Sequence, residues 1–123
     1  MKISFQEGGG NMKKLEIIIR PEKFEDLKKI LVDMKVSGMN ISNVMGYGNQ
    51  MGYVEQYRGV VYNVNLVPKM KVEVIVRDAK VDTILARIAE VLPTGNVGDG
   101  KVFVYECLDA MRIRTGAKGE EAL

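Results

Sequence analysis

Residues 14–27 read Lys-Leu-Glu-Ile-Ile-Ile-Arg-Pro-Glu-Lys-Phe-Glu-Asp-Leu, and residues 71–84 repeat the pattern as Lys-Val-Glu-Val-Ile-Val-Arg-Asp-Ala-Lys-Val-Asp-Thr-Ile. Each copy begins with a β-branched run that predicts a strand and continues with apolar residues at helical spacing that predict a helix. The helical positions are Phe24, Leu27, Leu31 and Met34 in the first copy, and Val81, Ile84, Ile88 and Val91 in the second. Each predicted helix therefore has one face for a core.

A further strand candidate follows each helix, at 39–45 and at 102–107. The order predicts an α+β fold of the ferredoxin-like type, βαββαβ, in which an antiparallel four-stranded sheet carries two helices on one face. Ile17, Ile18 and Ile19 are consecutive and place apolar side chains on both faces of the first strand. The second face then needs a cover. Self-association into a closed ring of subunits is the simplest cover, and a solvated, mildly apolar face is the alternative.

The composition is that of one ordinary globular domain, with 123 residues, 46% of them apolar and 28% charged. A net charge of +2 is too small to indicate binding to nucleic acid or to an anionic membrane, and no apolar run is long enough to span one, so we expect a cytoplasmic protein. The chain has no histidine, which excludes phosphohistidine chemistry, Ser-His and Cys-His nucleophiles and imidazole zinc sites. The single cysteine, Cys107, is expected to be an inert buried thiol.

The most informative local feature is a glycine-rich segment, residues 94–101, Thr-Gly-Asn-Val-Gly-Asp-Gly-Lys, with residues 112–116, Arg-Ile-Arg-Thr-Gly, soon after it. Glycines let successive backbone N–H groups converge on an anion, and lysine or arginine neutralises the anion's charge. Residues 95–101 match G-x-x-x-x-G-K, but Val102 stands where a P-loop has its magnesium-binding hydroxyl, and here a predicted helix precedes the glycines and a strand follows. We therefore predict an anion-binding loop of another kind, and a plain helix-to-strand connector is the alternative.

Residues 1–11 end in Gly8-Gly9-Gly10-Asn11 and carry no apolar pattern that continues into Met12. We expect them to be an N-terminal extension or leader, either translated from sequence upstream of a natural start at Met12 or added artificially. The domain would then be residues 12–123.

A long polar insert lies between the two copies, from about residue 47 to residue 67, and holds four of the five tyrosines. Compact domains mostly use short connections, so an insert of this length is typical of a functional loop. Residues 60–66 alternate apolar and polar side chains well enough to pair as a strand. We interpret the insert as a mobile recognition arm.

Several motifs together point to one family: Gly46-Tyr47-Gly48-Asn49-Gln50, Tyr57-Arg58-Gly59, Pro68-Lys69, residues 94–101 and residues 112–116. With these motifs, residues 12–123 closely resemble the PII signal-transduction proteins, the trimeric regulators of nitrogen metabolism. The resemblance implies a homotrimer. It also implies that the loops called T, B and C in the family are about residues 48–66, 93–101 and 113–120.

The resemblance further implies the ligands. In PII proteins ATP or ADP binds in each of three clefts between subunits, and the glycine-rich loop, its lysine and the arginines of the last loop reach the phosphates. The nucleotide-binding residues carried over are Ile18, Asn40, Gly46, Tyr47, Gly48, Asn49, Ile75, Gly98, Asp99, Gly100, Lys101, Arg112, Ile113 and Arg114. With ATP bound, Mg²⁺ and 2-oxoglutarate would join at the base of the T-loop, where Gln50 matches the family's metal ligand and Lys69 its partner for the distal carboxylate.

This chain departs from the family pattern in places that carry charge. Asn49 and Met51 stand where many relatives have arginine and lysine, and Asn96 replaces a frequent lysine. The lost positive charge predicts weaker binding, above all of 2-oxoglutarate. Tyr62 lies where some PII proteins are uridylylated or adenylylated, so the resemblance implies a modification site, with a packing or partner contact as the alternative.

The implied function is that of a regulator and not of an enzyme. ATP with 2-oxoglutarate and ADP alone would favour different T-loop conformations, and a partner such as an ammonium transporter, a nitrogen-assimilation enzyme or a transcriptional regulator would read one of them. No residue is an evident general base, so the nucleotide is interpreted as a signal. The alternatives are a small ferredoxin-like enzyme acting on a phosphate-containing substrate and an RNA-binding module, for which the strands at 15–19 and 72–76 lack stacking aromatics.

Overall fold

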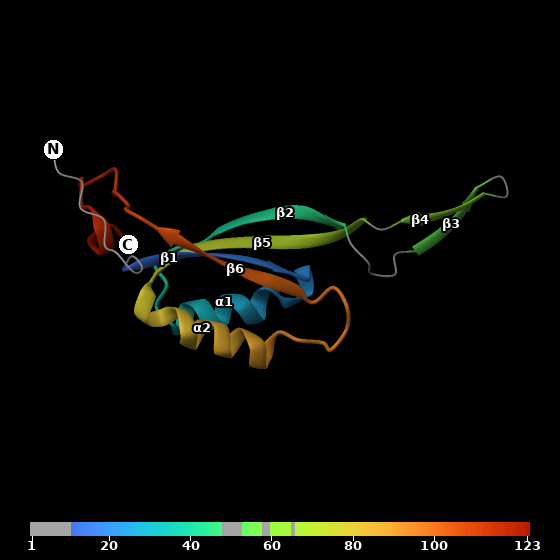
Figure 1. Ribbon diagram of the computed structural model, residues 1–123, viewed down its shortest axis with the longest axis horizontal. Helices are drawn as coiled ribbons and strands as arrows, with labels where there is room; N and C mark the ends of the chain where they lie inside the picture. The colour runs from blue at the N-terminus through green and yellow to red at the C-terminus, as the bar shows by residue number, and fades with distance from the viewer. Residues whose placement is uncertain (1–10, 48–52, 58–59, 65) are drawn as a thin grey trace.

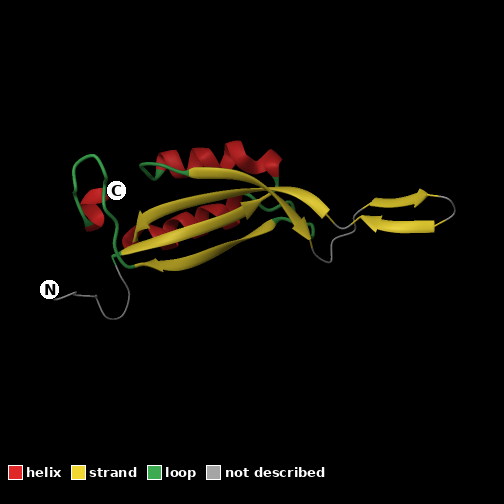
Figure 2. Ribbon diagram, turned by 90° about the horizontal axis from the view of Figure 1, so that it is seen from above, coloured by secondary structure: helices red, strands yellow, loops and turns green. Residues whose placement is uncertain are grey.

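The computed structural model describes residues 11–47, 53–57, 60–64 and 66–123. Its elements are β1 (Met12–Ile19), a 3-10 helix (Pro21–Lys23), α1 (Phe24–Asp33), β2 (Asn40–Tyr47), β3 (Tyr53–Tyr57), β4 (Val60–Val64), β5 (Leu66–Arg77), α2 (Asp78–Val91), β6 (Gly100–Cys107) and a second 3-10 helix (Gly119–Ala122). Four strands form one antiparallel sheet in the order β2-β5-β1-β6. Both helices cover the same face of this sheet (Figure 2), which confirms the ferredoxin-like α+β prediction.

The insert contains a separate hairpin in which β3 pairs with β4. The hairpin lies beyond the ends of β2 and β5 (Figure 1), away from the helices. The strand expected at 60–66 is therefore present as β4, although its partner is β3 and not the main sheet. Whether the arm is mobile stays a prediction.

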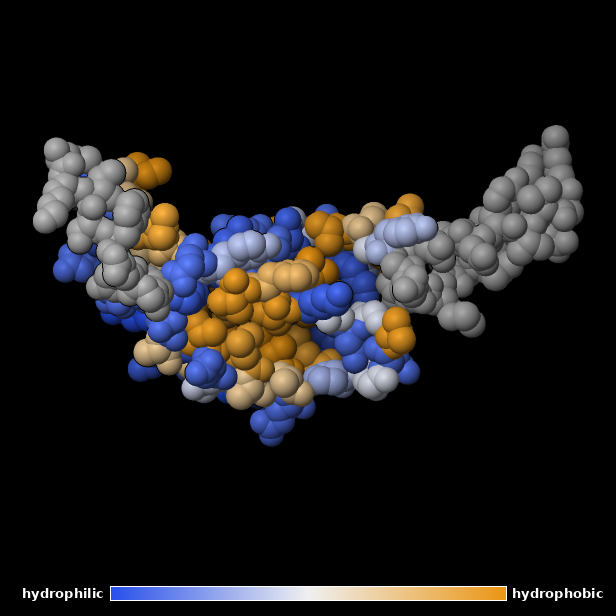
Figure 3. Space-filling model, in the orientation of Figure 1, coloured by the Kyte–Doolittle hydropathy of each residue, from blue (hydrophilic) through white to orange (hydrophobic). Residues whose placement is uncertain are grey.

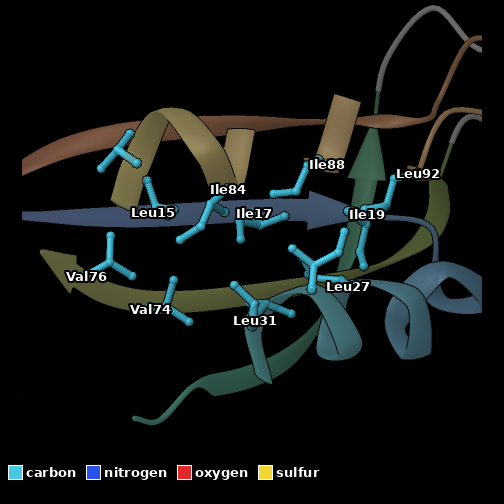
Figure 4. Packing of buried hydrophobic residues seen from close by; sticks show 13 residues of the cluster. Leu15, Ile17, Ile19, Leu27, Leu31, Val74, Val76, Ile84, Ile88 and Leu92 are labelled. Atoms are coloured by element: carbon cyan, nitrogen blue, oxygen red, sulfur yellow. The ribbon is translucent and has the colours of Figure 1, made fainter. Parts of the chain in front are cut away.

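The core lies between the helices and one face of the sheet (Figure 4). Alternate residues of the two central strands point into it, because side chains along a strand alternate between faces. These residues are Leu15, Ile17 and Ile19 of β1 and Val72, Val74 and Val76 of β5. The two helices pack against these residues with the apolar faces predicted from the sequence. Their buried residues include Leu27, Leu31, Ile84 and Ile88.

Two predicted core positions are wrong. Val91 is 41% exposed, and its neighbour Leu92 is buried in its place. With 3.6 residues per turn, positions 91 and 92 lie at opposite edges of the same helical stripe, so spacing alone cannot choose between them. Cys107 is only partly buried, because it ends the edge strand β6, and its Sγ lies 3.4 Å from the carbonyl oxygen of Asp109.

The second face of the sheet is more polar than three consecutive isoleucines indicate. Ile17 and Ile19 both point to the helices, which leaves only Ile18 of the three on the second face. Around it the register places Lys14 and Glu16 opposite Ile75 and Glu73. Lys14 pairs with Glu73 at 2.6 Å and Lys71 with Glu16 at 3.7 Å, and the Tyr105 hydroxyl donates to Glu16 at 2.9 Å. A cover for this face therefore has to match charges as well as apolar groups.

The edge at β6 leaves part of the helix-side core open. Figure 3 shows a patch of apolar side chains where β6 and α2 lie in Figure 1. Val104 of β6 is 45% exposed, and Leu85 of α2 is only partly buried. Within the ranges that the structure describes, neither helix is long and apolar enough to cross a bilayer.

Candidate functional site

The glycine-rich segment is an ordered loop between α2 and β6, beside the carboxyl end of β1. Three of its glycines have positive φ angles, 86° at Gly95, 98° at Gly98 and 108° at Gly100. At Gly100 a Cβ atom would lie 1.8 Å from the carbonyl oxygen of Ile18. Only glycine permits this approach, which fixes the loop against β1. The order helix, loop, strand agrees with the prediction that the segment is not a P-loop.

Asp99 holds the loop together from within. Its carboxylate accepts hydrogen bonds from the Thr94 hydroxyl, from the backbone N–H groups of Thr94 at 2.8 Å and Gly95 at 3.0 Å, and from Arg20 Nε at 3.0 Å. These donors, the Thr94 hydroxyl first and then Arg20, hold the pKa of Asp99 far below its usual range. The carboxylate of Asp99, a predicted nucleotide-binding position, is thus turned into its own loop. Only the backbone of Asp99 is left for a phosphate.

This arrangement predicts a pH dependence of stability. Because the pKa of Asp99 is lowered in the folded state, its contribution is fully present above the pKa of an unfolded aspartate, about 4. The contribution is lost as the pH falls from there toward the folded value. We expect urea titrations to show the wild-type chain more stable than an Asp99→Asn variant by a constant margin above pH 5, and by a shrinking margin between pH 4 and pH 2. A margin that stays constant down to pH 2 would contradict the lowered pKa.

Lys69 of β5 is the buried cation of the site. Its side chain is 5% exposed, and its Nζ donates a hydrogen bond to the carbonyl oxygen of Gly98. Burial, and then the nearby charge of Arg20, lower the pKa of Lys69. Gly46 of the adjacent strand β2 makes room for it, because a Cβ there would lie 3.0 Å from Lys69 Cγ. The residue predicted to meet 2-oxoglutarate is therefore held against the glycine-rich loop in this structure.

A hollow of about 470 Å³ opens beside the loop, and we call it the B-loop hollow. It brings together many of the predicted site residues from β1, β2, β5, β6 and the loop. Its lining consists of Ile18, Gly46, Tyr47, Lys69, Asn96, Val97, Gly98, Asp99, Gly100, Lys101 and Phe103. The register explains the grouping, because Lys101 at the start of β6 lies directly opposite Ile18. The predicted residues Gly48, Asn49 and Gln50 lie outside the described residues.

A second hollow, of about 540 Å³, lies farther along the sheet, and we call it the C-terminal hollow. Its lining consists of Lys14, Ser37, Gly38, Met39, Asn40, Glu73, Val74, Ile75, Ala122 and Leu123. Asn40 and Ile75 of the predicted nucleotide site are here. Ile18 is opposite Lys71, so Ile75 is four residues farther along β5, which is about 13 Å at 3.3 Å per residue.

The predicted arginines also belong to this end of the chain. They follow β6, whose last residue Cys107 lies opposite Met12 at the start of β1, whereas Lys101 lies opposite Ile18 near its end. The segment folds back on itself, with the Arg112 N–H donating to Ala117 at 2.8 Å and the Arg112 side chain donating to the Leu123 oxygen at 3.0 Å. Ile113 is 91% exposed and Arg114 is exposed as well. One chain therefore does not bring its predicted residues into a single site.

Sequence reasoning missed Arg20. This residue follows the strand of the first copy of the repeat, directly after β1, and its guanidinium reaches both Asp99 and the Val97 carbonyl oxygen. The signal available was the matching arginine of the second copy, Arg77, but among the described residues the ion pair of that side chain is an exposed one with Glu120 at 3.8 Å. Among the residues that the structure describes, no group of three acidic or cysteine side chains could hold a metal ion.

A ferredoxin-like sheet, a hairpin inserted between β2 and β5, and a glycine-rich loop that meets β1 and Lys69 are together the plan of a PII-type signalling domain. The chain belongs to this family, since the family model described as Nitrogen regulatory protein P-II matches residues 12–117.

Known members of this family are similar in sequence to nearly the whole chain. It is 47% identical over 112 residues to Nitrogen regulatory protein P-II of Haemophilus influenzae, and the match covers 91% of this chain and 100% of that protein. Nitrogen regulatory protein P-II 1 of Escherichia coli is 41% identical over the same shares. The chain is therefore a nitrogen-regulatory signal transducer, and the alternative of a small enzyme is not supported.

Solved structures of this family have the same fold. The structure of Bacillus subtilis GlnK in complex with ATP matches with a TM-score of 0.74 at 38% identity and covers 91% of this chain and 97% of its own. Arabidopsis thaliana PII bound to citrate matches with a TM-score of 0.75 at 30% identity, covering 96% and 97%.

Proposed function

We propose that the chain forms a homotrimer that binds ATP or ADP in clefts between subunits and passes the signal to partners through its T-loop, residues 48–66. The observation that carries this proposal is the division of the predicted nucleotide residues between two hollows of one chain. Residues in two separate hollows of one chain would face one ligand if the B-loop hollow of one copy met the C-terminal hollow of another. A closed ring supplies that meeting identically at each interface.

In each cleft one subunit would offer its B-loop hollow and its neighbour the C-terminal hollow. The phosphates would meet the backbone N–H groups of the glycine-rich loop and Lys101, whose side chain is exposed at the start of β6. Arg112 and Arg114 of the neighbour would add charge from the other side, since guanidinium groups bind phosphate through paired hydrogen bonds. The similarity to GlnK solved with ATP supports this assignment.

For 2-oxoglutarate we propose a site at Lys69 that couples to the nucleotide loop. Lys69 donates to the Gly98 carbonyl oxygen, so a carboxylate bound by the same ammonium would be linked to the glycine-rich loop through one side chain. Mg²⁺ would be held by Gln50 and by phosphate oxygens. Mg²⁺ usually keeps few protein ligands and takes phosphate oxygens.

The output is a change in the T-loop. Each set of ligands holds the base of the loop differently, and a coupling of about 1 to 3 kcal/mol is enough for useful switching. The partner class is that of nitrogen control in the cytoplasm, such as an ammonium transporter, a nitrogen-assimilation enzyme or a regulator. Tyr62 is proposed as an acceptor for nucleotidylylation within the same loop.

Calorimetry tests the nucleotide assignment directly. We expect the purified chain to bind both ATP and ADP, and to bind 2-oxoglutarate only with ATP and Mg²⁺ and more weakly than relatives that have arginine and lysine at positions 49 and 51. If calorimetry detects no heat of binding with either nucleotide at millimolar concentration, the proposal is rejected. Binding of nucleotide to a species whose mass is that of a monomer would reject the inter-subunit cleft.

A further inference from the structure

Arg20 makes two contacts with the glycine-rich loop that no part of the proposed site explains. Its Nε donates to Asp99 Oδ1 at 3.0 Å, and its Nη2 donates to the carbonyl oxygen of Val97 at 2.8 Å. The side chain is 22% exposed. One planar guanidinium thus ties a side chain and a backbone carbonyl of the loop to the end of β1.

A second cation holds the next carbonyl of the same loop. Lys69 of β5 donates to Gly98, so the carbonyl oxygens of Val97 and Gly98 both bind cationic side chains, one directly after β1 and one in β5. In a planar trans peptide the carbonyl and the following N–H point in opposite directions. The N–H groups of Gly98 and Asp99 therefore point away from these two cations. Within the described part of the chain, neither N–H donates to a backbone or side-chain acceptor.

The N–H groups of Gly98 and Asp99 are successive, find no acceptor among the described residues, and include a glycine with a φ of 98°, a combination typical of a small anion-binding nest. Their direction depends on the peptide planes, and the planes depend on what binds the carbonyls. The charge of Arg20 is offset by Asp99, so the arginine adds little net attraction for a phosphate. Its contribution lies in the geometry of the loop.

We propose that Arg20 is a positioning residue for phosphate binding, which orients the amides of Gly98 and Asp99 without itself touching the ligand. This inference rests on the proposed nucleotide-binding function. It predicts that Arg20 affects ligands in proportion to the phosphates they carry, whereas a purely structural residue would affect all ligands of the cleft alike.

The test compares Arg20→Met with Arg77→Met. Arg77 is a matched control, because it occupies the same place in the repeat and has the same extended backbone, φ −67° and ψ 141° against φ −64° and ψ 137° at Arg20. We expect Arg20→Met to weaken ATP and ADP binding about tenfold, which corresponds to about 1.4 kcal/mol, and to leave adenosine binding unchanged. Arg77→Met should leave all three unchanged. Arg20→Lys should recover part of the loss, because lysine can bind Asp99 but lacks the fork that also reaches Val97.

Hydrogen exchange provides a readout that does not depend on affinity. ATP should protect the amides of Gly98 and Asp99 in the wild-type chain and in Arg77→Met, and should protect them less in Arg20→Met at saturating ATP. Equal losses for ATP and adenosine, or unchanged ATP binding in Arg20→Met, would overturn the inference. If the wild-type chain binds no nucleotide, the proposed function fails instead, and faster exchange across residues 94–100 of free Arg20→Met than of free Arg77→Met still decides whether Arg20 orders the loop.

Discussion

Replacing Gly100 with alanine should abolish ATP and ADP binding and lower the free energy of unfolding by about 3 kcal/mol. The left-handed conformation costs an L-residue about 1 to 2 kcal/mol, and φ at Gly100 is 108°. A Cβ there would also lie 1.8 Å from the Ile18 carbonyl oxygen, a backbone atom that no side-chain rotation can move. Relieving such an overlap typically costs about 1 to 3 kcal/mol more. The loop would have to leave β1, and the amides proposed to bind phosphate would move with it.

Gly95→Ala is the matched control. Gly95 also has a positive φ, 86°, but a Cβ there would meet nothing within 4 Å. We expect this variant to lose only about 1 kcal/mol and to keep nucleotide binding. Thermal or urea unfolding measures the stabilities, and calorimetry the affinities. If the two variants lose equal stability, the cost of the positive φ angle explains both losses. The close approach of Gly100 to Ile18 would then contribute nothing to stability.

The fold could be predicted because local and tertiary signals agree in both copies of the repeat. Leu15, Ile17 and Ile19 alternate in sequence and point to the core, and the helix that follows repeats its apolar residues every three or four positions. The ends of the strands were harder to predict from the sequence. β6 starts at Gly100 and not at Val102, because Gly100 and Lys101 pair with Ile19 and Ile18 although glycine and lysine have low strand propensity.

The chemistry of the site could be predicted from composition, but its geometry could not. Glycines and a lysine in residues 94–101 indicate anion binding whatever the fold. The contacts of Arg20 with Asp99 and of Lys69 with Gly98 join residues that are 79 and 29 positions apart, and only the sheet register brings them together. The same limit applies to Asp99, whose type suggests a ligand contact but whose carboxylate is taken by its own loop.

Mixing two weakly binding variants should restore strong nucleotide binding. Lys101→Gln removes the exposed cation of the B-loop hollow, and Arg112→Gln removes a cation near the other end of the sheet. Each change deletes a charge-assisted contact worth about 1.5 to 3 kcal/mol, so each variant alone should bind ATP about 10 to 100 times more weakly. If the chain forms the proposed trimers, each cleft of trimers refolded from an equal mixture would draw on two neighbouring chains. About one quarter of the clefts then pair an intact Lys101 with an intact Arg112 if neighbours assort at random in a closed ring.

Calorimetry on the refolded mixture should therefore find sites of wild-type affinity at about one quarter of the wild-type number. The matched control mixes Lys101→Gln chains with chains that carry both changes, since no cleft in that mixture can hold both cations. Native mass spectrometry of differently tagged chains verifies that mixed trimers form in both cases. If mixed trimers form and no binding returns, the Lys101 and Arg112 that contact one nucleotide come from the same chain. If binding returns in the control as well, Lys101 does not contact the nucleotide. Only complementation confined to the first mixture agrees with a cleft built from the two ends of neighbouring sheets.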